Sequence, residues 1–114
     1  MKIQYHDLDN GIRLIELNGK LDIYGVNEID QTFIRYCTGD KLRVIVDLSR
    51  ISYLSSIGMP MLINTAKTIF RNGGRMVLLA PPKNVKDILL IAGIHLIIPI
   101  ADDFPSAKTT LTLS

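Results

Sequence analysis

Hydrophobic and polar residues alternate along two segments near the start of the chain. Ile3 and Tyr5 share one face of the first segment, and Ile12 and Leu14 share one face of the second. Such period-two spacing is typical of β-strands, because successive side chains point to opposite sides of a sheet. The intervening residues 7–11 end in an Asn-Gly pair, which tolerates the positive φ angles of a type I′ turn. We therefore expect the chain to open with a β-hairpin.

Further along, apolar residues recur at the three- and four-residue spacing of amphipathic helices. This pattern predicts helices over residues 26–37, 58–70 and 85–92, each followed closely by glycine, which commonly ends a helix. Residues 102–113 begin like a helix but are rich in threonine, which predicts only a short final helix. The apolar side of the second helix is predicted to comprise Met59, Leu62, Ile63, Ala66, Ile69 and Phe70.

Three short apolar segments predict the remaining strands. Residues 42–47 and 75–80 are mostly aliphatic and too short for helices, so we expect them in the buried centre of a sheet. Residues 97–100 predict a last short strand. Helices that alternate with strands after an initial hairpin favour the α/β class. The expected fold is a mixed β-sheet with about four helices packed against it and right-handed crossovers between the later strands.

The length and composition of the chain fit one folded domain over residues 1–114. Apolar residues make up 47% and charged residues 21% of the sequence, which is close to an average globular protein and unlike a disordered chain. A chain of this length is too short to build two separate hydrophobic cores.

Charge and cysteine content restrict the expected partners and compartment. The net charge of +2 is spread along the chain without a basic run, so nucleic acid is not an expected partner. Cys37 is the only cysteine, which excludes an internal disulfide and fits a reducing compartment. No secretion signal is visible, and the longest apolar stretch, residues 88–100, is too short to span a bilayer. We expect a cytoplasmic protein with no membrane partner.

Residues 46–59 carry the most informative motif of the sequence. Here Val-Asp-Leu-Ser ends a predicted strand and leads through Tyr53 to a Ser-Ser-Ile-Gly turn before a predicted helix. This arrangement resembles the signature of STAS domains, in particular of anti-sigma factor antagonists. The Gly-Lys-Leu-Asp segment at 19–22 and the Arg-Asn-Gly-Gly segment at 71–74 are also similar to that family, so the resemblance spans most of the chain. It implies the STAS fold.

The resemblance also implies a function for the turn. In anti-sigma factor antagonists the turn usually reads Asp-Ser-Ser/Thr-Gly-Leu, and a partner kinase that also binds the sigma factor phosphorylates the first serine after Asp. Aligned on Gly58, that serine is Ser56. The implied partners are an anti-sigma factor and serine kinase of the histidine-kinase-like ATPase fold, and a phosphatase that restores Ser56. Two residues depart from the family pattern, because Ser55 replaces the usual Asp and Ile57 replaces a small hydroxyl residue.

Physical chemistry also favours Ser56 as a modification site. A serine just before a helix offers its hydroxyl to solvent, and the unpaired amides of the first helical turn attract negative charge. Pro60 fits the first turn of a helix, which places Ser56 in the preceding turn. A phosphate there adds roughly −1.5 to −2 charge and disrupts a flat interface that lacks basic partners. The alternative is that Ser55 or Ser56 is an N-cap, which stabilises a helix by about 1 kcal/mol.

The predicted partner-binding surface comprises Asp22, Ser55, Ser56, Ile57, Gly58 and Met59. The family resemblance implies that Asp22 lies beside the serine turn and contributes to partner contacts. By itself the residue is equally consistent with a helix cap or a turn carboxylate. Met59 offers an adaptable contact, although methionine in a helix is more often core filling. Asp47, at the end of a predicted strand, is expected to bond turn amides rather than to act in catalysis.

The remaining polar residues predict neither a metal site nor an enzyme. His6 and His95 have no second His or Cys at ligand spacing, so no metal or other cofactor is expected. A hydrolytic pair of Ser56 with a histidine is an alternative, but the sequence has no Gly-x-Ser-x-Gly elbow and no evident third member. We expect a non-catalytic protein.

The leading hypothesis is a partner-switching phosphoprotein of signal transduction and transcription regulation. It docks on its kinase through the surface around Asp22 and Ser56 and is released when Ser56 is phosphorylated. The departures at Ser55 and Ile57 support a second hypothesis, in which a STAS scaffold or small-ligand-binding subunit acts in a larger regulatory assembly without phosphorylation. In either case we expect a monomer or a weak dimer.

Overall fold

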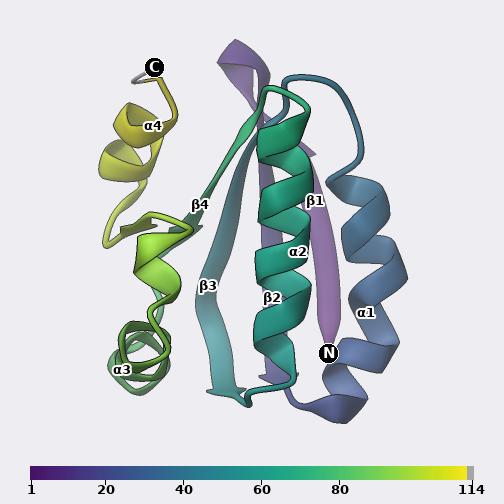
Figure 1. The fold of residues 1–114 in the computed structure, drawn as a ribbon, viewed down its shortest axis with the longest axis vertical. Coiled ribbons are helices and arrows are strands. Elements are labelled where there is room, and N and C mark those ends of the chain that lie inside the picture. The colour runs from purple at the N-terminus through teal and green to yellow at the C-terminus, as the bar shows by residue number, and fades with distance from the viewer. Residues whose placement is uncertain (113–114) are drawn as a thin grey trace.

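A computed structural model describes residues 1–112 and contains a five-stranded mixed sheet within them (Figure 1). The strands follow each other across the sheet in chain order, and only the first pair is antiparallel. They are β1 (Lys2–Asp7), β2 (Ile12–Leu21), β3 (Arg43–Leu54), β4 (Arg75–Leu79) and β5 (Ile100–Ala101). The predicted α/β class with an N-terminal hairpin is therefore confirmed.

The hairpin that joins β1 to β2 has a longer loop than its Asn-Gly pair predicts. Asn10 and Gly11 have the expected positive φ angles of 69° and 71°. However, Asp7 and Arg13 are the last paired residues of the two strands, so the turn is not a two-residue one. The half-buried Leu8, directly after the last paired residue of β1, packs against an apolar cluster on the sheet and lies outside the paired residues of the two strands.

The helices begin and end near their predicted positions. They are α1 (Ile23–Tyr36), α2 (Gly58–Arg71), α3 (Lys83–Ile91) and α4 (Phe104–Thr112). The helix α1 begins three residues earlier than its apolar spacing predicts, because Asp22 caps it. The predicted extension of the last helix to Leu113 lies outside the described residues. No helix within residues 1–112 is long and apolar enough to cross a bilayer.

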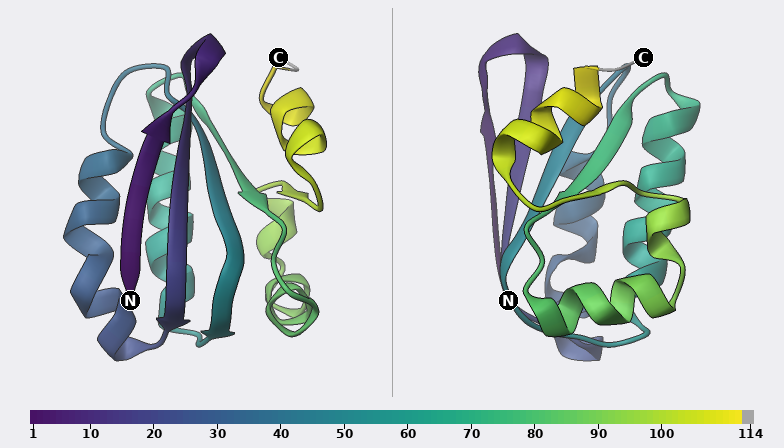
Figure 2. Two further views of the ribbon diagram at one scale, coloured as in Figure 1. Left: turned by 180° about the vertical axis from the view of Figure 1, so that it is seen from behind. Right: turned by 90° about the vertical axis from the view of Figure 1, so that its left-hand side faces the viewer.

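The sheet separates two apolar clusters. The larger cluster packs α1, α2 and α3 against one face, which includes the buried side chains of Val44 and Val46. The smaller cluster packs α4 against the other face around Ile45 and Val77. The cluster under α4 extends to Ile12 at the start of β2. Seen from behind, β1 and most of β2 lie to the side of α4 (Figure 2).

The strand β3 is longer than its apolar run predicts. It continues beyond Asp47 to Leu54, and the pairing register with β2 shifts twice along it. In this second half Leu48, Ile51 and Leu54 are buried at three-residue spacing, which is why the period-two pattern is lost. The Asp47 carboxylate accepts a hydrogen bond from the Ser49 amide at 2.9 Å, as expected for a structural residue, but Asp47 does not end the strand.

Two predictions near the later elements are wrong in detail. The segment before β5 contains a short 3₁₀ helix, Ile94–Leu96, so β5 is shorter than expected and begins only at Ile100. On α2, Phe70 was expected in the core but is 70% exposed. It follows the buried Ile69 and is therefore rotated by about 100° from it around the helix axis.

Candidate functional site at the Ser55–Ser56 turn

The turn that connects β3 to α2 is fastened to the end of β2. Both the amide and the hydroxyl of Ser55 donate hydrogen bonds to the carbonyl oxygen of Leu21, each at 3.0 Å. Ser55 is half-buried as a result. Because parallel strands end at the same edge of a sheet, these bonds place the turn directly beside the β2–α1 connection.

Ser56 is exposed in this turn, and no residue within 1–112 hydrogen-bonds its hydroxyl. Its carbonyl accepts the Met59 amide at 3.4 Å, so its backbone contributes to the first helical turn. The N-cap position of α2 belongs to Ile57, whose side chain makes no capping bond. The N-cap interpretation of Ser55 and Ser56 is therefore wrong. As predicted, Ser56 lies in the turn before a helix whose first turn contains Pro60.

Gly58 allows α2 to start in close contact with the sheet. A Cβ at this position would lie 3.0 Å from Leu54 Cδ1 and 3.2 Å from the carbonyl oxygen of Leu21. Gly58 is buried and Met59 is half-buried against the main core. Of the predicted partner-binding residues in this turn, Ser56 and Ile57 are the accessible ones.

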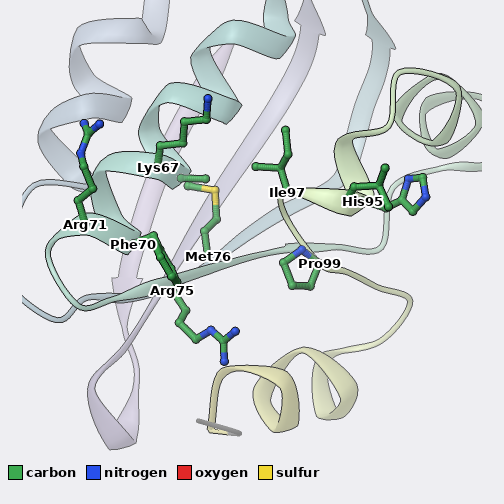
Figure 3. A pocket seen from close by; sticks show the side chains of 10 residues that line it. Lys67, Phe70, Arg71, Arg75, Met76, His95, Ile97 and Pro99 are labelled. Carbon is green, nitrogen blue, oxygen red and sulfur yellow. The ribbon is translucent and has the colours of Figure 1, made fainter.

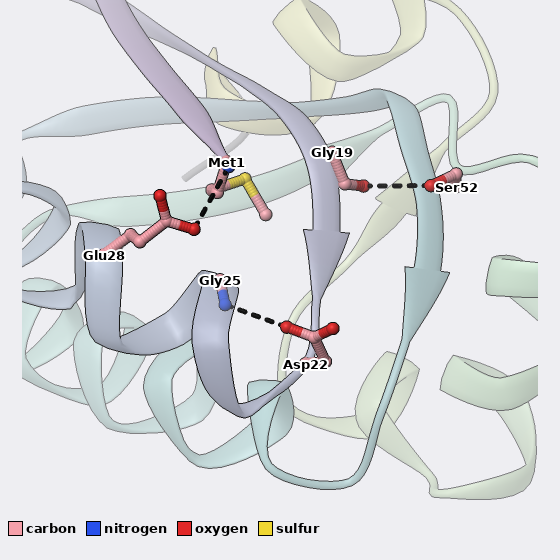
Figure 4. A network of polar contacts seen from close by, with 6 residues as sticks. All are labelled: Met1, Gly19, Asp22, Gly25, Glu28 and Ser52. Carbon is pink, nitrogen blue, oxygen red and sulfur yellow. Dashed lines mark hydrogen bonds and ion pairs between the residues drawn. The ribbon is translucent and has the colours of Figure 1, made fainter.

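Asp22 lies at the same edge and caps α1. Its Oδ1 accepts a hydrogen bond from the Gly25 amide at 2.8 Å (Figure 4). Gly25 itself is buried, and a Cβ there would collide with the carbonyl oxygen of Lys20. The helix-cap interpretation of Asp22 is thus confirmed, and its other carboxylate oxygen makes no hydrogen bond to residues 1–112.

Several residues at this edge were not singled out from the sequence. The Ser52 hydroxyl donates to the Gly19 carbonyl oxygen at 3.4 Å (Figure 4), and the Asn84 side chain donates to the Ser52 carbonyl oxygen at 3.4 Å. Ile23 and Tyr24, in the first turn of α1, are exposed at 50% and 76%. The sequence feature that could have identified Ile23 and Tyr24 is their position directly after Asp22, a candidate helix cap.

His6, one of the two histidines considered as a partner for Ser56, lies far from the serine turn. His6 on β1 pairs with Leu14 of β2, seven residues before the Leu21 that holds Ser55, which corresponds to roughly 23 Å along the strand. The His6 ring instead contacts Glu16 Oε1 at 2.7 Å. Within residues 1–112 there is no group of three or more His, Cys, Asp or Glu that could hold a metal ion.

The sheet order and the serine turn after a long third strand match a known protein family. Residues 7–107 match the sequence profile of the STAS domain. The chain belongs to the STAS domain family.

Several relatives of this STAS protein are named as anti-sigma factor antagonists. It is 25% identical over 107 residues to BtrV of Bordetella bronchiseptica, provisionally named as one, and the match covers 94% of this chain and 91% of BtrV. An anti-sigma factor antagonist from Mycobacterium paratuberculosis has the same fold, with a TM-score of 0.86, 18% identity and coverage of 96% and 92% of the two chains. The structure of unphosphorylated SpoIIAA, an anti-sigma factor antagonist, matches with a TM-score of 0.76 and 18% identity, and the match covers 99% of each chain.

These likenesses confirm the family and the fold expected from the Gly-Lys-Leu-Asp and Ser-Ser-Ile-Gly segments. This STAS protein is similar to anti-sigma factor antagonists, which are non-enzymatic regulators. The serine hydrolase alternative is therefore set aside.

Proposed function

We propose that this protein is a phosphorylation-controlled partner switch that docks on an anti-sigma factor and is released when Ser56 carries a phosphate. The partner would be a serine kinase of the histidine-kinase-like ATPase fold in the cytoplasm, and a phosphatase would restore Ser56. The observation that carries this proposal is the exposed Ser56 hydroxyl, unbonded within residues 1–112, at the start of α2. A solved structure of the relative SpoIIAA in its phosphorylated form supports it.

The surroundings of Ser56 explain how a phosphate would change binding without unfolding the protein. The backbone amides at the start of α2 favour a negative charge there. Ile57, next to Ser56, and Tyr24, in the first turn of α1 at the same edge of the sheet, expose apolar surface, with 44% and 76% of each residue accessible. A partner that covers this apolar surface would have to desolvate a phosphate carrying roughly −1.5 to −2 charge, which is strongly unfavourable without basic partners.

The departure at position 55 leaves the fold of the turn intact. The Ser55 hydroxyl is directed to the Leu21 carbonyl oxygen and is half-buried, so it is not the accessible serine of the pair. Ser56 is therefore the better kinase substrate of the two. The partner-binding surface that we propose consists of Asp22, Ser55, Ser56, Ile57, Gly58 and Met59, with Tyr24 added from the structure.

The test uses the tagged protein to capture its partner from cells of the source organism, followed by incubation with ATP. Mass spectrometry is expected to find one phosphate on wild-type protein and none on Ser56→Ala. Calorimetry with the purified partner is expected to show at least tenfold weaker binding by Ser56→Asp, a loss of about 1.4 kcal/mol. The matched control is Ser49→Ala, which removes another exposed serine and should change neither result.

Absence of phosphate from Ser56, together with unchanged partner binding by Ser56→Asp, would contradict the proposal. The second candidate, a scaffold subunit that is not phosphorylated, is favoured by Ile57, an apolar residue where the family usually has a hydroxyl. It predicts that the captured protein elutes in a stable large assembly whose size does not change with ATP.

A further inference from the structure

A groove of about 550 Å³ lies between the C-terminal half of α2 and the segment that leads to β5. Lys67, Phe70 and Arg71 approach it from α2, while Ile97 and Pro99 approach it from the other side, with Met76 of β4 between them (Figure 3). The groove shares no lining residue with the Ser55–Ser56 turn, which lies before the opposite end of α2.

Three large apolar side chains along this groove are unusually exposed to solvent. Phe70 is 70% exposed, Leu96 is 81% exposed and Ile97 is 49% exposed. Exposed apolar residues that gather around one concavity mark interaction sites more often than single ones do. A small ion would leave Phe70 and Leu96 uncovered, so the groove fits a ligand that extends across both rims.

The charged residues of the groove all have the same sign. Lys67 and Arg71 stand on α2, Arg75 stands on β4, and no Asp or Glu is among the lining residues that the structure describes. The Arg71 guanidinium donates to the Thr68 hydroxyl at 3.2 Å, a neutral acceptor that leaves its positive charge uncompensated by that contact. The electrostatic complement of this groove is therefore an anionic ligand with an apolar centre.

We propose that this groove is a second docking site, which binds an acidic peptide segment of a partner protein with an apolar side chain inserted between Phe70 and Ile97. The carboxylates of the segment would face Lys67 and Arg71. The lining has three Lys and Arg side chains and an apolar floor, whereas a nucleic-acid site has a row of cations that follows the phosphates. The groove is independent of the proposed switch, because it has its own residues and does not require Ser56.

Fluorescence polarisation with a labelled decapeptide tests this proposal. The peptide carries a central Leu-Phe pair flanked by two aspartates on each side, and control peptides replace either the aspartates by asparagine or the Leu-Phe pair by serine. We expect the first peptide to bind at low salt and both control peptides to bind at least tenfold more weakly. Binding should weaken as salt rises from about 0.05 to 0.5 M, because exposed charges are screened.

Two variants of the protein locate the bound peptide. The double variant Lys67→Glu/Arg71→Glu reverses two of the three Lys and Arg charges that line the groove and leaves Arg75 in place, and Phe70→Ser removes an exposed apolar contact without emptying the core. Each is expected to weaken peptide binding at least tenfold. Lys108→Glu on α4 is a control that reverses the charge of an exposed lysine outside the groove. Ser56→Asp is a control that changes the serine turn and leaves the groove intact. Both should bind the peptide as the wild-type protein does.

Equal binding of the peptide by wild-type protein and by both groove variants would overturn the proposal. Amide shifts confined to the Ser55–Ser56 turn in a ¹⁵N spectrum, with none around Phe70 and Leu96, would also overturn it. So would binding to vesicles of anionic phospholipid without binding to the peptide. Peptide binding to the groove is measured separately from partner binding by Ser56→Asp. The groove proposal and the Ser56 proposal can therefore fail independently of each other.

Discussion

At the scale of single residues, the carbonyl oxygen of Leu21 organises the candidate site. A carbonyl oxygen has two lone pairs, and here both the amide and the hydroxyl of Ser55 donate to it. The same oxygen lies close to Gly58, where a side chain would crowd it. Ser56 is thus held in place by its neighbours, although its own hydroxyl makes no hydrogen bond within residues 1–112.

Gly25 provides a test of close packing at this scale. In an ordinary helical position Gly→Ala stabilises by about 1 kcal/mol, but here the added methyl collides with the Lys20 carbonyl oxygen. Overpacking of this kind costs typically about 1–3 kcal/mol or more, so Gly25→Ala is expected to be clearly destabilising. Urea denaturation measures the free energy of unfolding.

The matched control for Gly25→Ala is Asn27→Ala, an exposed position two residues further along the same helix. It is expected to leave stability unchanged or slightly raised, because alanine favours helix and no contact is lost. If Gly25→Ala were as stable as this control, the close approach of α1 to Lys20 would be wrong.

At the scale of elements, Asp22 connects the end of β2 to the start of α1. The residue caps the helix, and it also belongs to the surface proposed for partner binding. Asp22→Ala is expected to lower the free energy of unfolding by about 1 kcal/mol through loss of the cap. Thermal or urea denaturation, together with partner binding, measures the two roles.

Asp22→Ser separates these roles, because serine caps about as well as aspartate but has no charge. The expected result is near wild-type stability with weakened partner binding. A variant that retains both stability and full partner binding would show that the carboxylate acts as a cap and nothing more.

Most elements followed from the sequence because their apolar residues have the period of the element. The hairpin and the helix over residues 58–70 are of this kind, whereas the strand over residues 75–80 was indicated by a short run of aliphatic residues. The second half of β3 was missed because its register shifts bury every third residue rather than every second. The first turn of α1 was missed because Ile23 and Tyr24 are exposed, so apolar spacing gives no signal there.

The candidate site was predicted in part. The turn itself and the position of Ser56 before α2 followed from the serine motif and Pro60. The hydrogen bonds of Ser55 to Leu21 join residues that are 34 positions apart, and such contacts depend on strand pairing rather than on local pattern. The same holds for the groove beside Phe70, because its two walls come from different elements.

At the scale of the whole molecule, the main core encloses the single cysteine at the end of α1. Burial raises the pKa of the Cys37 thiol to about 12, and the nearby positive charge of Arg13 opposes this effect only in part. The folded protein therefore keeps this thiol protonated at pH values where an unfolded chain ionises it, above about 8.5. Ionisation in the unfolded state then favours unfolding.

The expected consequence is a loss of stability at alkaline pH that depends on this thiol. Because the folded pKa is raised, its contribution is fully present below about pH 8.5 and is lost as the pH rises toward 12. At pH 10 the loss amounts to about 2 kcal/mol. Urea denaturation of wild-type protein and Cys37→Ala at pH 7 and pH 10 measures it, and Cys37→Ala should lack this component. Equal pH dependence in both proteins would contradict it.

The helix α2 carries the serine turn before its first residue and the basic groove beside its last turns. Its 14 residues span about 21 Å, since each residue of an α-helix adds about 1.5 Å. A partner chain that occupies both places needs a linker of about six or seven extended residues to connect them. Such a bivalent partner would keep the second segment at an effective concentration in the millimolar range after release of the first. Phosphorylation would then loosen the complex at one end while the other end stays tethered.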